Sequence, residues 1–274
     1  MTKTRISIAA AAALITVTAV FVATRDSGDE HATGQAPTTA TATTTAAPGA
    51  GGQFDNPTFD WLGRKVVVPF NPAGVMLAQR EPSTPRTECN TGNAAVTAPE
   101  GVQIQRTFHV PTLLSASDGP SRIDGTTPVG YRRSPQGAAL AAWNYFIRLT
   151  VTGEQQRDFM LKLGVITDAE RNKVMSAEVK EPTAEAIRTL HGMTAPEAFR
   201  VLSCDSDTMF IEFANRTDLA KDGKPLANHQ WAGRRLHLQW REGDWKVPMV
   251  DSQGVGSGQT YPSLDDSWTR WTIS

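Results

Sequence analysis

The stretch Leu238-Gln-Trp-Arg-Glu-Gly-Asp-Trp-Lys-Val247 carries the clearest local structure in this sequence. Its first residues continue an alternation of apolar and polar side chains that begins at Trp231, which predicts one long strand. Arg241-Glu-Gly-Asp244 then has the composition of a tight turn, and residues 245–250 form a second apolar run. The stretch is therefore predicted to be a β-hairpin.

Upstream of this hairpin, strands and helices complete the predicted domain. Residues 198–204 and 208–213 have the apolar content of strands. Before them the apolar residues recur every three to four positions. Ser134 is a good N-cap for the first of these segments, and Thr167 with Glu170 forms a capping box for another. The predicted helices cover residues 134–147, 154–163, 167–179 and 183–190. Helices followed by an antiparallel meander indicate an α+β domain.

The N-terminal segment indicates export. Residues 6–23 carry no charge and would span about 27 Å as a helix, close to the thickness of a bilayer core. Lys3 and Arg5 precede the run, which favours a cytoplasmic N-terminus and a C-terminal domain outside the cell. The prediction is a single-pass protein of the cell membrane that contacts the bilayer through residues 6–23. The alternative is a cleaved signal peptide and a secreted protein, with Val17-Thr18-Ala19 as the peptidase site.

Five regions follow from these patterns. Residues 25–53 are almost entirely Thr, Ala, Gly, Pro and a few polar groups, so they are expected to form a disordered tether. Residues 54–130 contain two predicted strands, at 65–68 and 102–110, but too few apolar residues for a core of their own. The predicted layout is anchor or signal peptide 1–24, tether 25–53, irregular/β extension 54–130 packed on the main domain, α+β domain 131–250, and Gly/Ser-rich tail 251–274.

The two cysteines suit an oxidising compartment. Cys89 and Cys204 are an even count, and a bridge between them would close a long loop. Such a bridge would stabilise the fold by up to about 4–5 kcal/mol on the chain-entropy model. Two separate buried thiols, each packing as a small hydrophobic group, are the alternative. We expect the bridge.

Catalytic and metal-binding patterns are missing from the sequence. The net charge of −1 and the scattered basic pairs do not favour nucleic acid as a partner. No histidine pair has metal-ligand spacing, and no nucleophile elbow or phosphate loop occurs. No cofactor, metal or catalytic residue is therefore predicted. The histidines are His31, His109, His191, His229 and His237.

Aromatic residues in the polar tail are the remaining candidates for a binding site. Trp268 and Trp271 lie among Gly, Ser and Asp residues, and Tyr261 precedes them. Large aromatic side chains in such a setting are typical of protein contact surfaces. These three residues are predicted to form a partner surface.

The predicted layout resembles a known fold, and three of its sequence motifs resemble a known family. Three or four helices followed by a curved antiparallel sheet that ends on a hairpin resemble the cone-shaped fold of nuclear transport factor 2. Ser117-Asp-Gly-Pro120, Pro128-Val-Gly-Tyr131 and Ser134-Pro-Gln-Gly-Ala-Ala-Leu-Ala-Ala142 resemble a family of membrane-anchored or secreted actinobacterial proteins of uncharacterised function, many from mobile or conjugative elements. Arg132-Arg133 departs from that pattern, which has a small residue and often a histidine there. No role of that histidine is transferred.

The architecture of one anchor and one extracytoplasmic cone-shaped domain is similar to the bitopic assembly subunit of type IV secretion and Gram-positive conjugation channels. This is an analogy of fold. It implies a non-enzymatic interaction domain with protein partners in a membrane or cell-wall assembly, and self-association into a homo-oligomer stays open. The alternatives are a small-ligand-binding or enzymatic domain that uses the cone, and a wall-binding module that uses Trp268 and Trp271.

Overall fold

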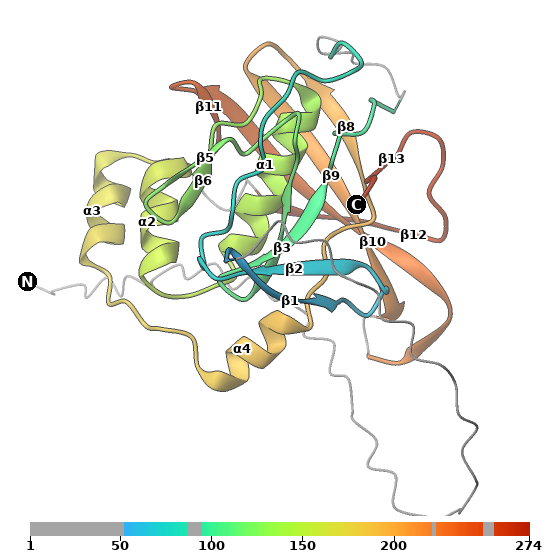
Figure 1. Ribbon diagram of the computed structural model, residues 1–274, viewed down its shortest axis with the longest axis horizontal. Coiled ribbons are helices and arrows are strands. Elements are labelled where there is room, and N and C mark those ends of the chain that lie inside the picture. The colour runs from blue at the N-terminus through green and yellow to red at the C-terminus, as the bar shows by residue number, and fades with distance from the viewer. Residues whose placement is uncertain (1–51, 87–94, 221–222, 249–254) are drawn as a thin grey trace, which may run out of the picture.

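The computed structural model describes residues 52–86, 95–220, 223–248 and 255–274. Within them a first sheet has the strand order β1-β2-β3-β4. Neighbouring strands are antiparallel except β2 and β3, which run parallel. The strands are β1 (Phe54–Phe59), β2 (Lys65–Pro69), β3 (Gln103–Thr107) and β4 (Val110–Leu114). This sheet, blue to green in Figure 1, lies within the predicted extension.

Helices follow, at the positions that the capping signals predicted. The side chain of Ser134 accepts a hydrogen bond from the Gly137 amide, and Thr167 and Glu170 form the expected capping box. A short hairpin precedes the helices, and a two-residue strand separates the second and third. The elements are β5 (Arg122–Asp124), β6 (Thr127–Val129), α1 (Pro135–Arg148), α2 (Glu154–Leu163), β7 (Gly164–Val165), α3 (Asp168–Ser176) and α4 (Ala184–His191).

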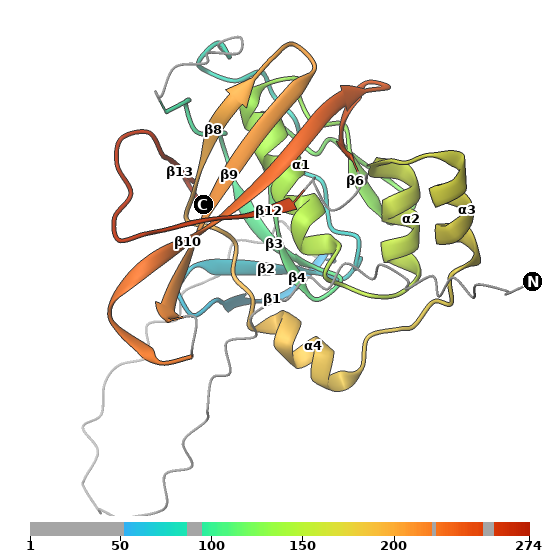
Figure 2. The ribbon, with the colours of Figure 1, turned by 180° about the vertical axis from the view of Figure 1, so that it is seen from behind.

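A second, larger sheet is built from the C-terminal half of the chain. Its strand order is β13-β8-β9-β10-β11-β7, and β12 also pairs with β10. All of its neighbours are antiparallel except β7, which lies parallel to β11. The strands are β8 (Ala198–Cys204), β9 (Thr208–Leu219), β10 (Pro225–Arg241), β11 (Asp244–Pro248), β12 (Val255–Tyr261) and β13 (Thr269–Arg270). Figure 2 shows its long strands crossing in front of α1.

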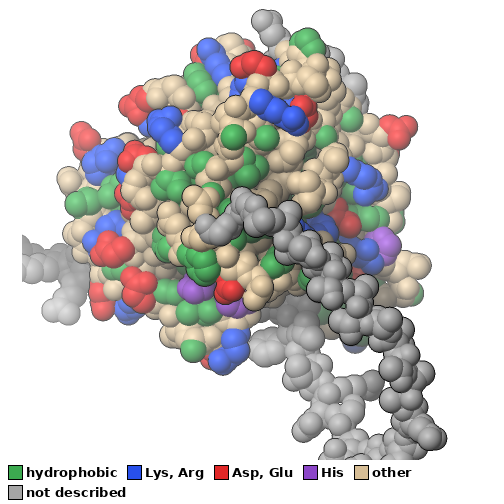
Figure 3. All heavy atoms as spheres, in the orientation of Figure 1, with side chains coloured by type: hydrophobic (Ala, Val, Ile, Leu, Met, Phe, Trp, Pro, Cys, Tyr) green, Lys and Arg blue, Asp and Glu red, His purple; other side chains and the backbone are tan. Residues whose placement is uncertain are grey.

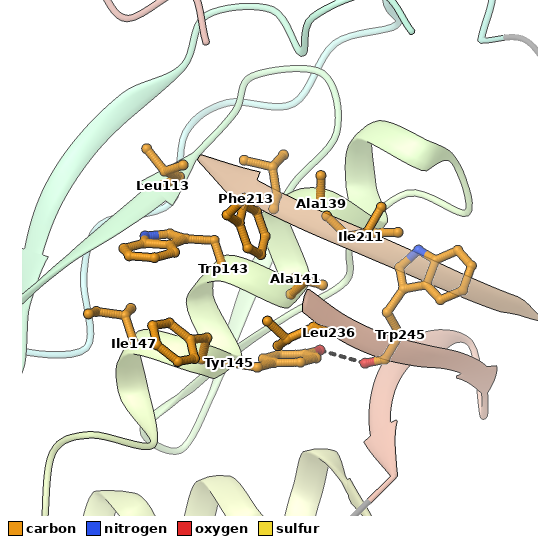
Figure 4. Packing of buried hydrophobic residues seen from close by; sticks show 14 of the residues in the cluster. Leu113, Ala139, Ala141, Trp143, Tyr145, Ile147, Ile211, Phe213, Leu236 and Trp245 are labelled. Carbon is orange, nitrogen blue, oxygen red and sulfur yellow. Dashed lines mark hydrogen bonds between the residues drawn. The ribbon is translucent and has the colours of Figure 1, made fainter. Parts of the chain in front are cut away.

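Helix α1 lies between the two sheets and is buried along its whole length. It packs against β4 on one side and against β8, β9, β10 and β11 on the other. The Trp143 indole donates a hydrogen bond of 2.8 Å to the Pro111 carbonyl, and the Tyr145 hydroxyl donates one of 2.5 Å to the Trp245 carbonyl (Figure 4). Truncating an aromatic residue in such a core typically costs about 3–5 kcal/mol. Helix α1 therefore joins the two sheets into one core.

The predicted α+β class and the main hairpin are confirmed. Strands β10 and β11 pair through Trp240 and Trp245, and Glu242 and Gly243 form the turn with φ values of 54° and 78°. Positive φ at both turn positions gives the twist that favours a tight hairpin. The hairpin stretch therefore gave the right local structure.

One strand prediction was wrong, and two strands in the C-terminal segment were not predicted. Residues 102–110, predicted as one strand, contain a turn at Phe108 and His109, whose φ values are 43° and 76°. β3 and β4 therefore form a second hairpin there. The predicted tail is no appendage in its described part, because β12 pairs with β10 and β13 pairs with β8. Backbone pairing to a sheet edge needs few apolar side chains, which is why composition did not reveal these strands.

The boundary predicted between extension and main domain does not divide the core. Val66, Ile104 and Leu113 from the first sheet belong to the same buried cluster as Leu140 of α1 and Leu236 of β10. The described helices include none that is long and apolar enough to cross a membrane. The predicted anchor and nearly all of the tether lie outside the described residues, so these remain predictions.

Candidate functional site

The concave side of the larger sheet is occupied by protein. Trp143 is 1% exposed and Phe146 7%, and Trp240 packs against the same cluster. Two open hollows lie elsewhere on the surface. One, of about 290 Å³, lies beside α4 and is lined by Thr150, Thr152, Pro182, Ala186, Thr189, Leu190 and Met193. The other, of about 230 Å³, lies beside β8 and is lined by Arg200, Val201, Leu202, Asp265 and Ser267.

Glu212 is the centre of the densest polar network on the large sheet. Its side chain on β9 is fully buried. Arg200 of β8 donates to it through Nε at 3.0 Å and Nη2 at 2.7 Å, and Arg235 of β10 donates through Nε at 3.0 Å. The Tyr261 hydroxyl of β12 lies 3.1 Å from both carboxylate oxygens. Side chains from three other strands therefore bind the Glu212 carboxylate of β9.

Close backbone approach makes room for this network. A Cβ atom on Gly258 would lie 2.2 Å from Glu212 Oε1, and one on Gly233 would lie 2.6 Å from it. Glycine at both positions allows β10 and β12 to pass over the carboxylate. The Arg200 guanidinium also stacks on the rings of Tyr261 and Trp268, at 5.0 and 4.4 Å. The network therefore attaches the C-terminal segment to the sheet.

Asp118 forms a second buried network at the start of α1. Arg86 binds its two carboxylate oxygens through Nε at 3.1 Å and Nη2 at 2.5 Å. The hydroxyls of Ser117 and Ser134 donate to it at 2.5 and 3.0 Å. Ser134 also caps α1 by accepting from Gly137 N at 3.0 Å. The Ser117-Asp-Gly-Pro and Ser134-Pro-Gln-Gly motifs thus belong to one structural unit.

Asp244 likewise connects two sequence motifs, Gly130-Tyr131 and Gly243-Asp-Trp245. Its carboxylate accepts from the backbone amides of Gly130 at 2.6 Å, Tyr131 at 3.2 Å and Trp245 at 2.9 Å. Burial raises the pKa of Asp244, while these three amides and Arg122 act in the opposite direction. The carboxylate therefore ties the main hairpin to the loop before α1, and its role is structural.

An exposed aromatic group lies at the other edge of the molecule. Phe59, Trp61 and Phe70 are 69%, 51% and 63% exposed, more than the next Phe or Trp side chain that the structure describes, Phe210 at 38%. All three belong to the β1–β2 hairpin or follow it directly. Figure 3 shows the face on which this hairpin lies, where hydrophobic side chains appear among charged ones. We call Phe59, Trp61 and Phe70 the aromatic hairpin.

The predicted partner surface in the tail is corrected by this geometry. Trp268 and Trp271 are 6% and 8% exposed, and the Trp271 ring packs on Phe199 with centroids 4.5 Å apart. Tyr261 is partly buried and bonded to Glu212. The polar sequence around these residues did not reveal that Tyr261 at the end of β12 and the tryptophans on either side of β13 are turned inward. None of the three offers a free aromatic surface.

The predicted bridge between Cys89 and Cys204 stays a prediction, because Cys89 lies outside the described residues. Cys204 ends β8 and is 9% exposed. No cysteine in the described part of the chain is free.

Among the described histidines, His191 and His229 are exposed, His109 and His237 are partly buried, and His109 and His191 lie together. His191 Nε2 at the end of α4 lies 3.4 Å from His109 Nδ1 in the β3–β4 turn. Burial, Arg106 and His109 lower the pKa of His191. Arg133 pairs with Asp207, as expected for a solvent-facing basic residue. His237 lies on β10 as predicted.

Arg148 is an unusual buried cation at the end of α1. It is 1% exposed, and Nε and Nη1 have no hydrogen-bond partner. Its guanidinium lies 4.2 Å from the ring centroid of Phe108 and 5.5 Å from that of Phe159. Burial lowers the pKa of Arg148 to about 10. The two rings and one bond to the Thr126 carbonyl at 3.2 Å are its partners among the described residues.

Comparison with known proteins places the chain in a family. The match is to a family described as a domain of unknown function, DUF8175, and it extends over residues 67–270. The chain belongs to this family. No curated protein and no solved structure matches it. The DUF8175 match includes both buried networks and Phe70, whereas Phe59 and Trp61 precede it.

Two features of the DUF8175 chain, the Glu212 network and the aromatic hairpin, were not predicted from its sequence. Glu212 stands between Ile211 and Phe213 in an apolar strand, and a charged residue at such a position signals a buried ion pair. The aromatic hairpin has a weaker signal, because exposed and buried aromatics look alike without a clear alternation.

Proposed function

We propose that this DUF8175 chain is a membrane-tethered, extracytoplasmic interaction domain and acts as an accessory or structural component of a conjugation or secretion apparatus. In this proposal residues 6–23 anchor the chain and residues 25–53 form a flexible tether. A tether of this length has a root-mean-square reach of about 30 Å. The domain would then work close to the membrane that anchors it.

The proposal is supported by the combination of a filled interior and an exposed group of aromatic residues. All residues of α1 are buried between the sheets, and Trp143 and Phe146 occupy the side on which a cone-shaped domain would hold a ligand. At the same time the aromatic hairpin leaves three large side chains in solvent. A filled interior together with exposed aromatic residues favours contact with a partner surface over binding of a small molecule.

We also propose that the α1–β11 region is a cone-shaped domain similar to nuclear transport factor 2. Two helices lead into a short strand, β7, that pairs in parallel with β11. The strands β8 to β11 follow as an antiparallel meander around α1. This arrangement supports the analogy with the bitopic assembly subunits, and an experimental structure compared with theirs would test it.

The functional test is capture of the full chain from its native membrane. A tagged chain would be crosslinked in growing cells, solubilised and purified, and the co-purifying proteins identified. We expect subunits of a membrane channel, at levels above those captured by an equally tagged, unrelated membrane protein. Recovery of the tagged chain alone, in crosslinked cells that transfer DNA or secrete protein normally, would refute the proposal.

The other functions considered from the sequence have less support. A ligand carrier or enzyme would need space inside the cone, where aromatic side chains lie instead. A wall-binding module that uses Trp268 and Trp271 would need those side chains in solvent, and both are buried. The interaction domain is therefore the function that we carry forward.

A further inference from the structure

We propose that the aromatic hairpin docks on the surface of the lipid bilayer. Phe59, Trp61 and Phe70 would enter the interfacial region, and basic side chains beside them would face lipid phosphates. This inference rests on the proposed membrane tether and adds a second, non-covalent contact between the folded domain and the membrane.

The three rings are unusually exposed. Each is more than half exposed, although the fold buries large aromatics such as Trp143 and Phe213 completely or nearly so. Single exposed apolar residues are common on protein surfaces, but a group of large ones typically marks an interaction site. Phe59 and Trp61 lie at the turn end of the hairpin, where Phe59 pairs with Lys65, and Phe70 follows the other end, where Phe54 pairs with Pro69. The hairpin therefore offers exposed rings at both of its ends to a partner surface.

Hydrogen bonds hold the turn that carries Trp61 in a fixed conformation. The Asp60 carboxylate accepts from the backbone amides of Leu62 and Arg64 at 3.0 and 2.9 Å, which fixes the turn around Trp61. The Arg64 side chain binds Asp60 and also donates to the carbonyls of Ala195 and Pro196. A fixed turn reduces the entropy lost when Trp61 enters a contact.

The predicted tether enters the fold beside the hairpin. The Phe70 amide donates a hydrogen bond of 2.9 Å to the carbonyl of Gln53, the last residue of the predicted tether. Phe70 and the end of the predicted tether are therefore adjacent. The 29 residues from 25 to 53 keep this point within about 30 Å of the predicted anchor on average. Of all surfaces of the domain, the hairpin is thus tied most directly to the membrane.

The chemistry of the hairpin also suits a bilayer better than an added strand. Trp and Phe favour the interfacial region of membranes. Lys65 is exposed opposite Phe59 in the strand register, and the Arg216 guanidinium lies 5.8 Å from the Trp61 ring. Cations at this position can face anionic headgroups. Pro57 interrupts the outer edge strand β1 and disfavours pairing with a strand from a partner protein.

Intrinsic fluorescence gives a direct test in the full chain. All seven tryptophans follow residue 60, so the predicted anchor contributes no signal. The full chain would be reconstituted into vesicles of phosphatidylcholine and phosphatidylglycerol with or without brominated acyl chains, which quench tryptophan on contact. We expect quenching in the wild type that is almost abolished in Trp61→Phe. In Trp268→Phe, which changes a buried ring, the quenching should stay at the wild-type level.

A second variant tests the rings around Trp61. Phe59→Ser/Phe70→Ser keeps the fluorophore and removes two of the three interfacial contacts, so quenching should fall at least about twofold. The matched control is Phe210→Ser, which alters an aromatic residue that is 38% exposed on β9. Circular dichroism and the melting temperature of each variant establish that it is folded before its quenching is compared.

The outcomes separate this inference from the proposed function. Co-flotation with vesicles and equal quenching in the wild type and Trp61→Phe would overturn docking and leave the tether intact. Failure of the wild type to co-float would refute tether and docking together. Protection of Trp61 from iodide by a co-purified protein, with no protection by vesicles, would overturn docking in favour of a protein contact.

Discussion

Asp118 and Glu212 are both fully buried carboxylates bound by arginine, yet they differ in how close their partners are to water. Arg86, the partner of Asp118, has a side chain that is 7% exposed. The partners of Glu212 are more accessible, since Arg200 is 20% and Arg235 41% exposed. The first network lies where the loop at Arg86 meets α1, and the second lies on the large sheet under the C-terminal segment.

This difference decides what happens when a carboxylate is lost. A cation that remains buried without a partner costs several kcal/mol, whereas one that can turn into solvent recovers hydration. The Asp118 network is therefore expected to behave as part of the global fold. The Glu212 network is expected to control a local opening of β12 and β13.

The largest effect is expected for Asp118→Ala. The change leaves Arg86 buried and removes the support of the α1 cap, so the free energy of unfolding should fall by about 3–5 kcal/mol. Urea denaturation measures the loss. The double variant Arg86→Met/Asp118→Ala should regain part of it, because no charge is left unpaired. A loss equal to that of Glu212→Gln would contradict the comparison.

Glu212→Gln comes second, with an expected loss of about 1–3 kcal/mol. The amide keeps the shape of the side chain but not the charge that Arg200 and Arg235 bind. Hydrogen exchange should become faster in residues 255–261 and stay unchanged in residues 135–148. Equal acceleration in both segments would mean that the network supports the whole fold.

Ser134→Ala separates the cap from the ion pair in the first network. The Ser134 hydroxyl serves both Gly137 and Asp118, so its removal should cost about 1–2 kcal/mol. Ser134→Thr, which keeps the hydroxyl, is the control and should lose less. Urea midpoints of the three proteins give the answer, and an effect as large as that of Asp118→Ala would assign the stability to the cap alone.

The smallest effect is expected for the exposed pair of His109 and His191. The folded pKa of His191 is below its ordinary value, so the unfolded chain takes up the proton more readily. The pair therefore stabilises the docking of α4 above about pH 6.5, and this contribution is lost as the pH falls below that value. Melting temperatures of the wild type and His191→Gln should converge at low pH. Parallel curves would show that His191 does not titrate as described.

The sequence predicted local structure better than it predicted contacts between distant parts. Ser134, the Thr167 capping box and the Glu242–Gly243 turn act through neighbours a few residues away, so their patterns identified the right elements. Glu212 depends on Arg200, Arg235 and Tyr261, which only strand order brings together. The predicted surface role of Trp268 and Trp271 failed for the same reason, because their burial depends on pairing with β8.

The contact between Val102 and Ile273 has a consequence for how the chain folds. These residues form a parallel bridge, and the Ser274 amide donates to the Val102 carbonyl at 3.0 Å. A contact across so many residues of sequence raises the contact order and slows folding. The bridge between Val102, which precedes β3, and Ile273, which follows β13, therefore forms only after residue 273 has been synthesised. A kinetic hydrogen-exchange experiment is expected to find the Ser274 amide protected later than the amides of the β3–β4 hairpin.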